Sequence, residues 1–123
     1  MLTPTDAELA ILRALWTLDA ATVRAVHEHL GRAGAYTTTL KTMQIMHEKG
    51  LVERDTRQRS HIYRAAVERD AVERTLVTEL SDKVFGGSAA RLALRALSLE
   101  PASAEDIDAL RALIDRHDRG EKS

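Results

Sequence analysis

Residues 36–50, YTTTLKTMQIMHEKG, have the pattern of one helix that begins among hydroxyl residues and ends at a glycine. At about 100° per residue, one face of this helix collects apolar side chains together with one threonine. These side chains are Tyr36, Thr39, Leu40, Met43 and Met46. The opposite face carries Thr38, Lys41, Thr42 and Ile45, with no acidic residue among them. One interpretation is an ordinary amphipathic helix with a solvated outer face; the other is a face that contacts another molecule.

The chemistry of this outer face suits the major groove of DNA. Lys41 can bind a phosphate or the acceptor atoms of guanine, and the threonine hydroxyls can reach phosphates or base edges. The Thr42 methyl group and Ile45 can pack against thymine methyl groups. We therefore predict DNA contacts for Thr38, Lys41, Thr42 and Ile45.

The residues before this helix predict two more helices. Thr5 and Glu8 have the spacing of a capping box, so a first helix is expected from about this point. Thr22 is expected to cap a second helix. Thr37 is expected to be the N-cap of the third, and Gly50 has the position of a left-handed residue after its end.

Two short strands follow, over residues 51–54 and 61–64, joined by the polar segment 55–60. Three helices and a basic hairpin are the element order of a winged helix-turn-helix domain, a mainly α fold with a small β-hairpin. Arg57 and Arg59 fall at the tip of the hairpin, where we predict contacts with phosphates or the minor groove. The alternative for both arginines is a solvated turn.

From residue 67 onward the pattern is purely helical, so we predict a winged helix-turn-helix domain over residues 1–66 and a C-terminal helical dimerisation region over residues 67–123. Ser88 and Ser103 are expected to cap two of its helices. Their apolar stripes are too narrow for a separate core, which favours pairing with a second copy of the chain. Packing back on the first domain is the alternative. The residues expected in the dimer interface are Leu76, Leu80, Leu92, Leu97, Leu110 and Leu113.

The composition limits the possible functions. The chain has 123 residues and no cysteine, which excludes disulfides, thiolate zinc sites and cysteine nucleophiles. Residues 36–66 carry six basic and three acidic side chains, whereas residues 67–123 carry nine basic and twelve acidic ones. This division is expected where one segment meets phosphates and another meets protein. No apolar run approaches the roughly 18 residues of a membrane span, so we expect a cytoplasmic protein that does not insert into membranes.

Metal, cofactor and catalytic sites are not predicted. His27 and His29 point about 200° apart on one helix and cannot share an ion, so surface histidines are the expected interpretation. His47 and Glu48 lack the second histidine of a zinc protease motif. No grouping of nucleophile and base has a useful spacing, so we do not expect an enzyme, and Trp16 is expected in the core.

The motifs together resemble the penicillinase repressor (BlaI/MecI/CopY) family of winged-helix transcriptional regulators, from about Leu2 to His117. The segments that carry the resemblance are 5–9 with Trp16, 36–38, 42–43, 48–52, the strand around Tyr63, and 85–88. The resemblance implies a homodimeric repressor bound to a dyad-symmetric DNA operator. Members of the β-lactam branch of the family are inactivated when a membrane sensor-protease system triggers cleavage in the C-terminal region, so the resemblance also implies such a system as a partner.

Two departures from the family pattern concern metal binding by the C-terminal tail and the position of proteolytic cleavage. The copper-responsive branch binds metal through a cysteine-rich tail, which this cysteine-free chain does not have. The β-lactam repressors are cut at an Asn–Phe bond, and the corresponding residues here are Arg95 and Ala96. Two alternatives to the repressor remain: a winged-helix regulator with a small molecule in the dimer crevice, and a winged-helix module that binds protein.

Overall fold

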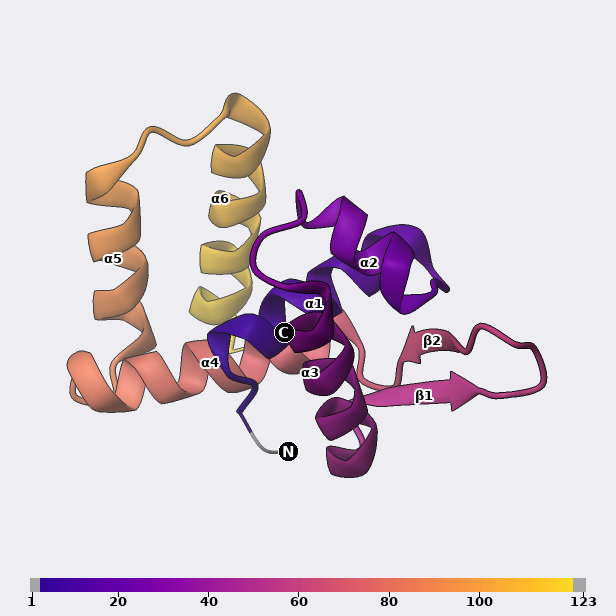
Figure 1. Cartoon of the computed structure of the whole chain (residues 1–123). Helices are drawn as coiled ribbons and strands as arrows, with labels where there is room; N and C mark the ends of the chain where they lie inside the picture. Colours follow the sequence, from indigo (N-terminus) through magenta and orange to yellow (C-terminus); the bar gives the residue numbers. More distant parts are fainter. Residues whose placement is uncertain (1–2, 121–123) are drawn as a thin grey trace. The chain divides into compact units, whose positions relative to one another are not determined.

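The computed structural model describes residues 3–120, which form six helices and one two-stranded antiparallel sheet (Figure 1). In chain order the elements are α1 (Asp6–Leu18), α2 (Val23–His29), α3 (Tyr36–Lys49), β1 (Val52–Asp55), β2 (Ile62–Ala65), α4 (Arg69–Val84), α5 (Ala89–Leu99) and α6 (Ala104–Asp118). The chain divides into an N-terminal unit, Met1–Val77, and a C-terminal unit, Thr78–Ser123. The predicted fold class, a winged helix-turn-helix followed by helices, is confirmed.

Side-chain caps begin the first two helices as predicted. The Thr5 backbone N–H donates to Glu8 Oε1 at 2.9 Å, and the Glu8 N–H donates to Thr5 Oγ1 at 3.2 Å, which completes the capping box. Thr22 Oγ1 accepts from the Ala25 N–H at 3.1 Å at the start of α2. Local sequence therefore fixes both helix starts.

The predicted cap of α3 is wrong. The N-cap is Ala35 rather than Thr37, and no side chain caps this helix. Gly34 has a φ of 71°, a backbone conformation that glycine adopts freely, and Ala35 is extended. The chain thus enters the helix two residues earlier than expected. At the other end, Gly50 has a φ of 83° and closes the helix in the left-handed conformation, as predicted.

The two strands form the expected hairpin, each shifted by one residue from its predicted start. They pair in the register Val52 with Ala65 and Asp55 with Ile62. Ala21 adds a bridge to the sheet, because its N–H donates to the Tyr63 oxygen at 3.0 Å and its oxygen accepts from the Tyr63 N–H at 2.8 Å. This bridge attaches the α1–α2 connection to the hairpin.

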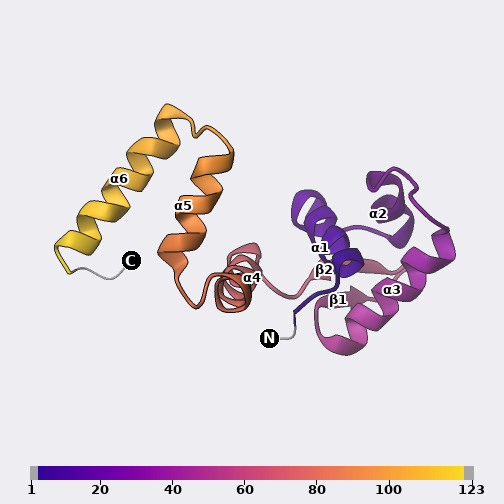
Figure 2. The ribbon, with the colours of Figure 1, turned by 90° about the vertical axis from the view of Figure 1, so that its left-hand side faces the viewer.

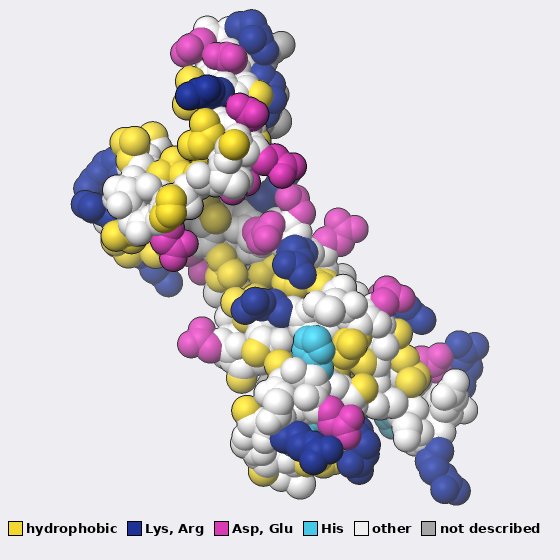
Figure 3. All heavy atoms as spheres, turned by 90° about the horizontal axis from the view of Figure 1, so that it is seen from above, with side chains coloured by type: hydrophobic (Ala, Val, Ile, Leu, Met, Phe, Trp, Pro, Cys, Tyr) yellow, Lys and Arg dark blue, Asp and Glu magenta, His cyan; other side chains and the backbone are white. Residues whose placement is uncertain are grey.

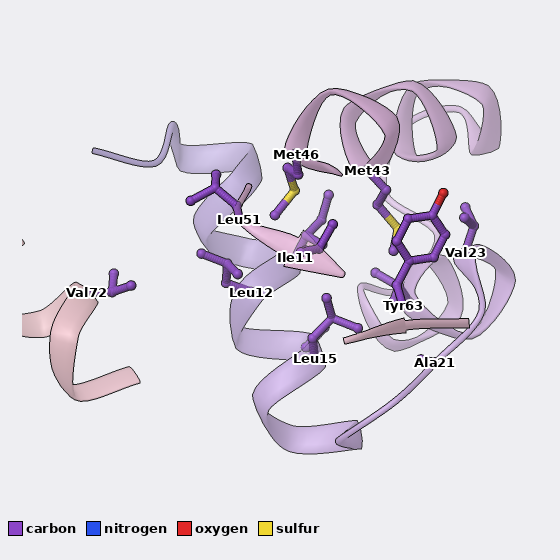
Figure 4. Packing of buried hydrophobic residues seen from close by; sticks show 13 residues of the cluster. Ile11, Leu12, Leu15, Ala21, Val23, Met43, Met46, Leu51, Tyr63 and Val72 are labelled. Atoms are coloured by element: carbon purple, nitrogen blue, oxygen red, sulfur yellow. The ribbon is translucent and has the colours of Figure 1, made fainter. Parts of the chain in front are cut away.

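One hydrophobic core holds the N-terminal unit together. Met43, Tyr63 and Val23 lie beside one another in this core, and Met46 lies near Ile11 (Figure 4). All five side chains are buried. Since Met43 and Met46 are the inward residues of α3, the opposite face of that helix is turned away from the core.

The core continues past the predicted domain boundary at residue 66. Val72 of α4 is 1% exposed, and Leu76 packs against the same cluster. Trp16 is half-buried, and its Nε1–H donates to the Val67 oxygen at 3.0 Å. The first part of α4 therefore belongs to the compact N-terminal unit, which ends at Val77.

The C-terminal unit has little core of its own. Ser88 Oγ accepts from the Arg91 N–H at 3.1 Å and Ser103 Oγ from the Asp106 N–H at 3.0 Å, so both predicted caps are confirmed. Helices α5 and α6 run antiparallel side by side (Figure 2), and neither has a buried residue. Hydrophobic side chains are visible on the surface of these helices (Figure 3). Among residues 3–120, no helix is long and apolar enough to cross a membrane.

Candidate nucleic-acid interface

The outer face of α3, defined by Thr38, Lys41, Thr42 and Ile45, lies on the surface. Thr38 and Lys41 are exposed, and Ile45 is 38% exposed although it is a large apolar residue. The Thr42 hydroxyl donates to the Thr38 carbonyl oxygen at 2.8 Å, so its proton is used within the helix. What Thr42 offers a ligand is therefore its methyl group and an acceptor oxygen.

An ion pair attaches the C-terminal end of α3 to α1. Lys49 Nζ lies 2.8 Å from Glu8 Oε2, and the Glu8 side chain is only 3% exposed. Burial alone raises the pKa of the Glu8 carboxyl, but the hydrogen bonds from Lys49 and Thr5 outweigh it, and the pKa is lowered overall. Glu8 therefore stays ionised and holds the helix in place.

His27 is not the surface histidine that the sequence predicts. It is 8% exposed, and its Nδ1 lies 3.0 Å from the Thr39 Oγ1. Its ring meets the Tyr36 ring edge to face, with 5.7 Å between centroids. His27 thus packs α2 against α3. Among the described residues, no three His, Cys, Asp or Glu side chains are grouped to hold a metal ion.

The two arginines of the hairpin tip differ. Arg57 Nη2 lies 2.7 Å from Asp55 Oδ2, and Arg57 Nε donates to both carboxylate oxygens at 3.0 and 3.2 Å. These hydrogen bonds lower the pKa of Asp55 to about 2 and raise the pKa of Arg57. Arg59 is exposed and has no ion pair within residues 3–120. Arg59 is therefore the unneutralised cation of this hairpin tip.

A cavity of about 410 Å³ lies between α2, α3 and the hairpin. Its lining includes Leu40 and Gln44 of α3 and no acidic residue. Four basic side chains line it: Arg24, Arg54, Arg59 and His61. We call this cavity the basic groove.

Only Arg59 of these four residues was predicted from the sequence as a site residue; Arg24, Arg54 and His61 were not. The Arg24 guanidinium lies 5.3 Å from the centre of the Tyr36 ring, a cation–π distance. Arg54 Nε is buried, and no hydrogen-bond partner for it exists among the described residues. The signal in the sequence was the alternation of the strand, which puts Arg54 on the same side as the buried Val52. A half-buried arginine without a carboxylate partner suits a ligand that supplies the negative charge.

The structure groups most of the predicted DNA-contact residues. The outer face of α3 is continuous along one helix, and Arg59 lines the basic groove, as does the α3 residue Gln44. Arg57 is turned toward Asp55 instead.

The six leucines predicted for dimerisation do not share one environment. Leu76 packs on the core of the N-terminal unit, so its burial is explained within one chain. Leu80 and Leu97 are 45% and 43% exposed. The remaining three are half-buried: Leu92, Leu110 and Leu113.

The comparison with known protein families agrees with this arrangement. Residues 4–116 match the family model described as "Penicillinase repressor". A comparison of the sequence with curated proteins found no match. A match over nearly the whole chain, together with the winged helix-turn-helix and its basic groove, shows that this chain belongs to the penicillinase repressor family of DNA-binding transcriptional repressors.

Proposed function

We propose that the protein is a homodimeric repressor that binds a dyad-symmetric operator through the outer face of α3 and the basic groove. One observation supports this most directly. An exposed helix face without acidic residues adjoins a cavity with four basic side chains and no acidic residue in its lining. A polyanion is the ligand that suits such a surface.

Each group has a proposed task. Lys41 binds guanine or phosphate in the major groove, Thr38 bonds phosphate, and Thr42 and Ile45 contact thymine methyl groups. Arg59 binds a phosphate or enters the minor groove. These contacts place α3 in the position of a recognition helix.

Arg57 has a second proposed task beside its pair with Asp55. Its Nη1 takes no part in the hydrogen bonds to that carboxylate. Nη1 can therefore reach a phosphate while the ion pair stays closed.

Dimerisation is proposed for the C-terminal helices because they leave apolar side chains exposed within one chain. Leu94 is 69% exposed and Ile114 is 57% exposed, besides the predicted Leu80 and Leu97, whereas the predicted Leu92, Leu110 and Leu113 are half-buried. A two-fold dimer matches a dyad operator, and linking two half-sites raises affinity through effective concentration. The homodimer is thus the form expected to repress.

Release by a membrane sensor-protease system is a further part of the proposal. The peptide bond between Arg95 and Ala96 lies within α5, and both residues are exposed. A cut there would separate α6 from the rest of the chain and break the dimer. The two half-sites would then be bound independently.

The test begins by selecting an operator from random DNA and titrating it at several salt concentrations. Lys41→Ala is expected to weaken operator binding by about 1–3 kcal/mol if Lys41 reads a base. If it binds only phosphate, all DNA sequences weaken alike and the salt slope falls by about one. Lys83→Ala, which removes the same charge from an exposed position in α4, is the matched control and should change little.

Two results of these DNA titrations would contradict the proposal. If Lys41→Ala leaves binding to both operator and scrambled DNA unchanged, the outer face of α3 does not contact DNA. If the wild-type chain binds DNA with no salt dependence or not at all, the protein-interaction module becomes the better interpretation.

A further inference from the structure

Helices α5 and α6 leave an open groove between them. Its volume is about 410 Å³, and Leu97, Leu110 and Leu113 contribute apolar side chains to its lining. Asp106, in the first turn of α6, and Arg116, in the last turn, line the same groove. Because the groove has a negative charge at one end and a positive charge at the other, these charges can determine the orientation in which a partner helix binds.

Both charges are available for a partner. Neither the Asp106 nor the Arg116 side chain makes an ion pair with any of the described residues. Arg116 follows Asp106 by ten positions in the helix, or about 15 Å along its axis. The Asp106 backbone N–H is used in the Ser103 cap, but its carboxylate is not.

This arrangement of charges complements itself under a two-fold axis. When two copies of α6 lie antiparallel, the first turn of one helix meets the last turn of the other. Asp106 then faces Arg116 of the second copy, and the reciprocal pair forms at the other end. The axis passes near Leu110, and Ala109 lies opposite Leu113 of the second copy. A parallel pairing would instead place Asp106 against Asp106 and Arg116 against Arg116.

We propose that α6 pairs antiparallel with α6 of a second copy, each helix seated in the other's α5–α6 groove, in a register set by two reciprocal Asp106–Arg116 ion pairs. This inference rests on the proposed homodimer and states how its two copies recognise one another. The apolar groove supplies most of the contact, whereas the charges choose the orientation.

A charge exchange in the full chain tests the pairing. Asp106→Arg alone and Arg116→Asp alone each place like charges opposite one another twice per dimer. Each variant is expected to have a homodimer dissociation constant about tenfold or more above the wild-type value. An equimolar mixture of the two variants is expected to form a heterodimer. One chain then presents two positive charges and the other two negative charges, so both contacts are attractive. The double variant D106R/R116D should form homodimers again.

Sedimentation equilibrium gives the dissociation constants, and mixing of fluorescently labelled variants measures the heterodimer directly. Circular dichroism of each variant controls for loss of helix, since Asp106 also favours the N-terminal end of α6. Recovery in the mixture is independent of that effect, because both variants are still present.

The experiments distinguish an error in the antiparallel α6 register from an error in the proposed homodimer. If wild-type chains dimerise and the mixture associates no better than each variant alone, the antiparallel α6 register is wrong and the homodimer stands. If the wild-type chain is monomeric at micromolar concentration, the proposed homodimer itself is wrong.

Discussion

Glu8 is a single residue on which two elements depend. Its carboxylate accepts from the Thr5 N–H in the capping box of α1 and binds Lys49 at the end of α3. It is nearly fully buried, so its charge is tolerated only because these donors surround it. The ion pair therefore fixes α3 relative to α1.

Lys49→Met is expected to destabilise the protein by about 1–3 kcal/mol at neutral pH, since it leaves a buried carboxylate without its ionic partner. The pKa of Glu8 is lowered in the folded chain, so its contribution is present above the ordinary value of 4.5 and is lost as the pH falls through the lowered pKa. The difference between Lys49→Met and wild type should thus shrink in acid. Chemical denaturation at a series of pH values measures it.

Glu8→Gln is the companion variant, because its amide oxygen can still accept from the Thr5 N–H while the charge is gone. If the free energy of unfolding of either variant equals that of wild type at neutral pH, the ion pair does not stabilise the fold.

At the scale of the element, the hairpin tip between β1 and β2 contains one paired arginine, Arg57, and one arginine, Arg59, without an ion pair among the described residues. Arg59→Gln is expected to reduce the salt slope of DNA binding by about one, because Arg59 is free to bind a phosphate. Arg57→Gln should have the smaller effect, since Asp55 already neutralises Arg57. Asp55→Asn should strengthen binding to non-specific DNA, because it frees Arg57 while its amide can retain the turn.

Titrations of each hairpin variant against the same DNA at several salt concentrations check this order. The pKa of Asp55 is about 2, so the carboxylate stays ionised and the order should hold throughout the neutral and mildly acidic range. An Arg57→Gln effect larger than that of Arg59→Gln would show that DNA binding opens the Asp55–Arg57 pair.

The elements also show which features the sequence could predict. Helix starts capped by side chains, at Thr5, Thr22, Ser88 and Ser103, depend on neighbours three residues away and were predicted correctly. The start of α3 was not, because it depends on backbone geometry at Gly34 rather than on a capping side chain.

Features that depend on tertiary contacts could not be predicted from the sequence. The burial of His27 comes from its contact with Thr39, twelve residues away. The basic groove combines Arg24 from α2 with Arg54 from β1, and helical periodicity cannot bring such distant segments together. The outer face of α3 was visible in the sequence because all its residues belong to one helix.

At the scale of the whole molecule, the compact units separate the two proposed tasks. The outer face of α3 and the basic groove lie within Met1–Val77, whereas the α5–α6 groove lies within Thr78–Ser123. DNA recognition and dimerisation can therefore be changed independently, although tight operator binding requires both.

Truncation after Val77 tests this division. The shortened chain keeps Val72, which is 1% exposed, and the Val67 oxygen that accepts from Trp16, so it is expected to fold as a monomer. Operator affinity should fall by orders of magnitude, because each half-site is then bound independently. Truncation after Ala66 should be clearly less stable, since it removes both contacts. Thermal unfolding, sedimentation and DNA titration compare the two truncated chains with the full one.

Val72→Ala in the full chain is the matched control, because it removes part of the same packing without shortening the chain. It should cost about 1–3 kcal/mol of stability and leave the dimer intact. If the chain ending at Ala66 proves as stable as the one ending at Val77, the first turns of α4 do not complete the core. If the chain ending at Val77 still dimerises, dimerisation does not depend on α5 and α6, and the assignment of that task to the C-terminal unit is wrong.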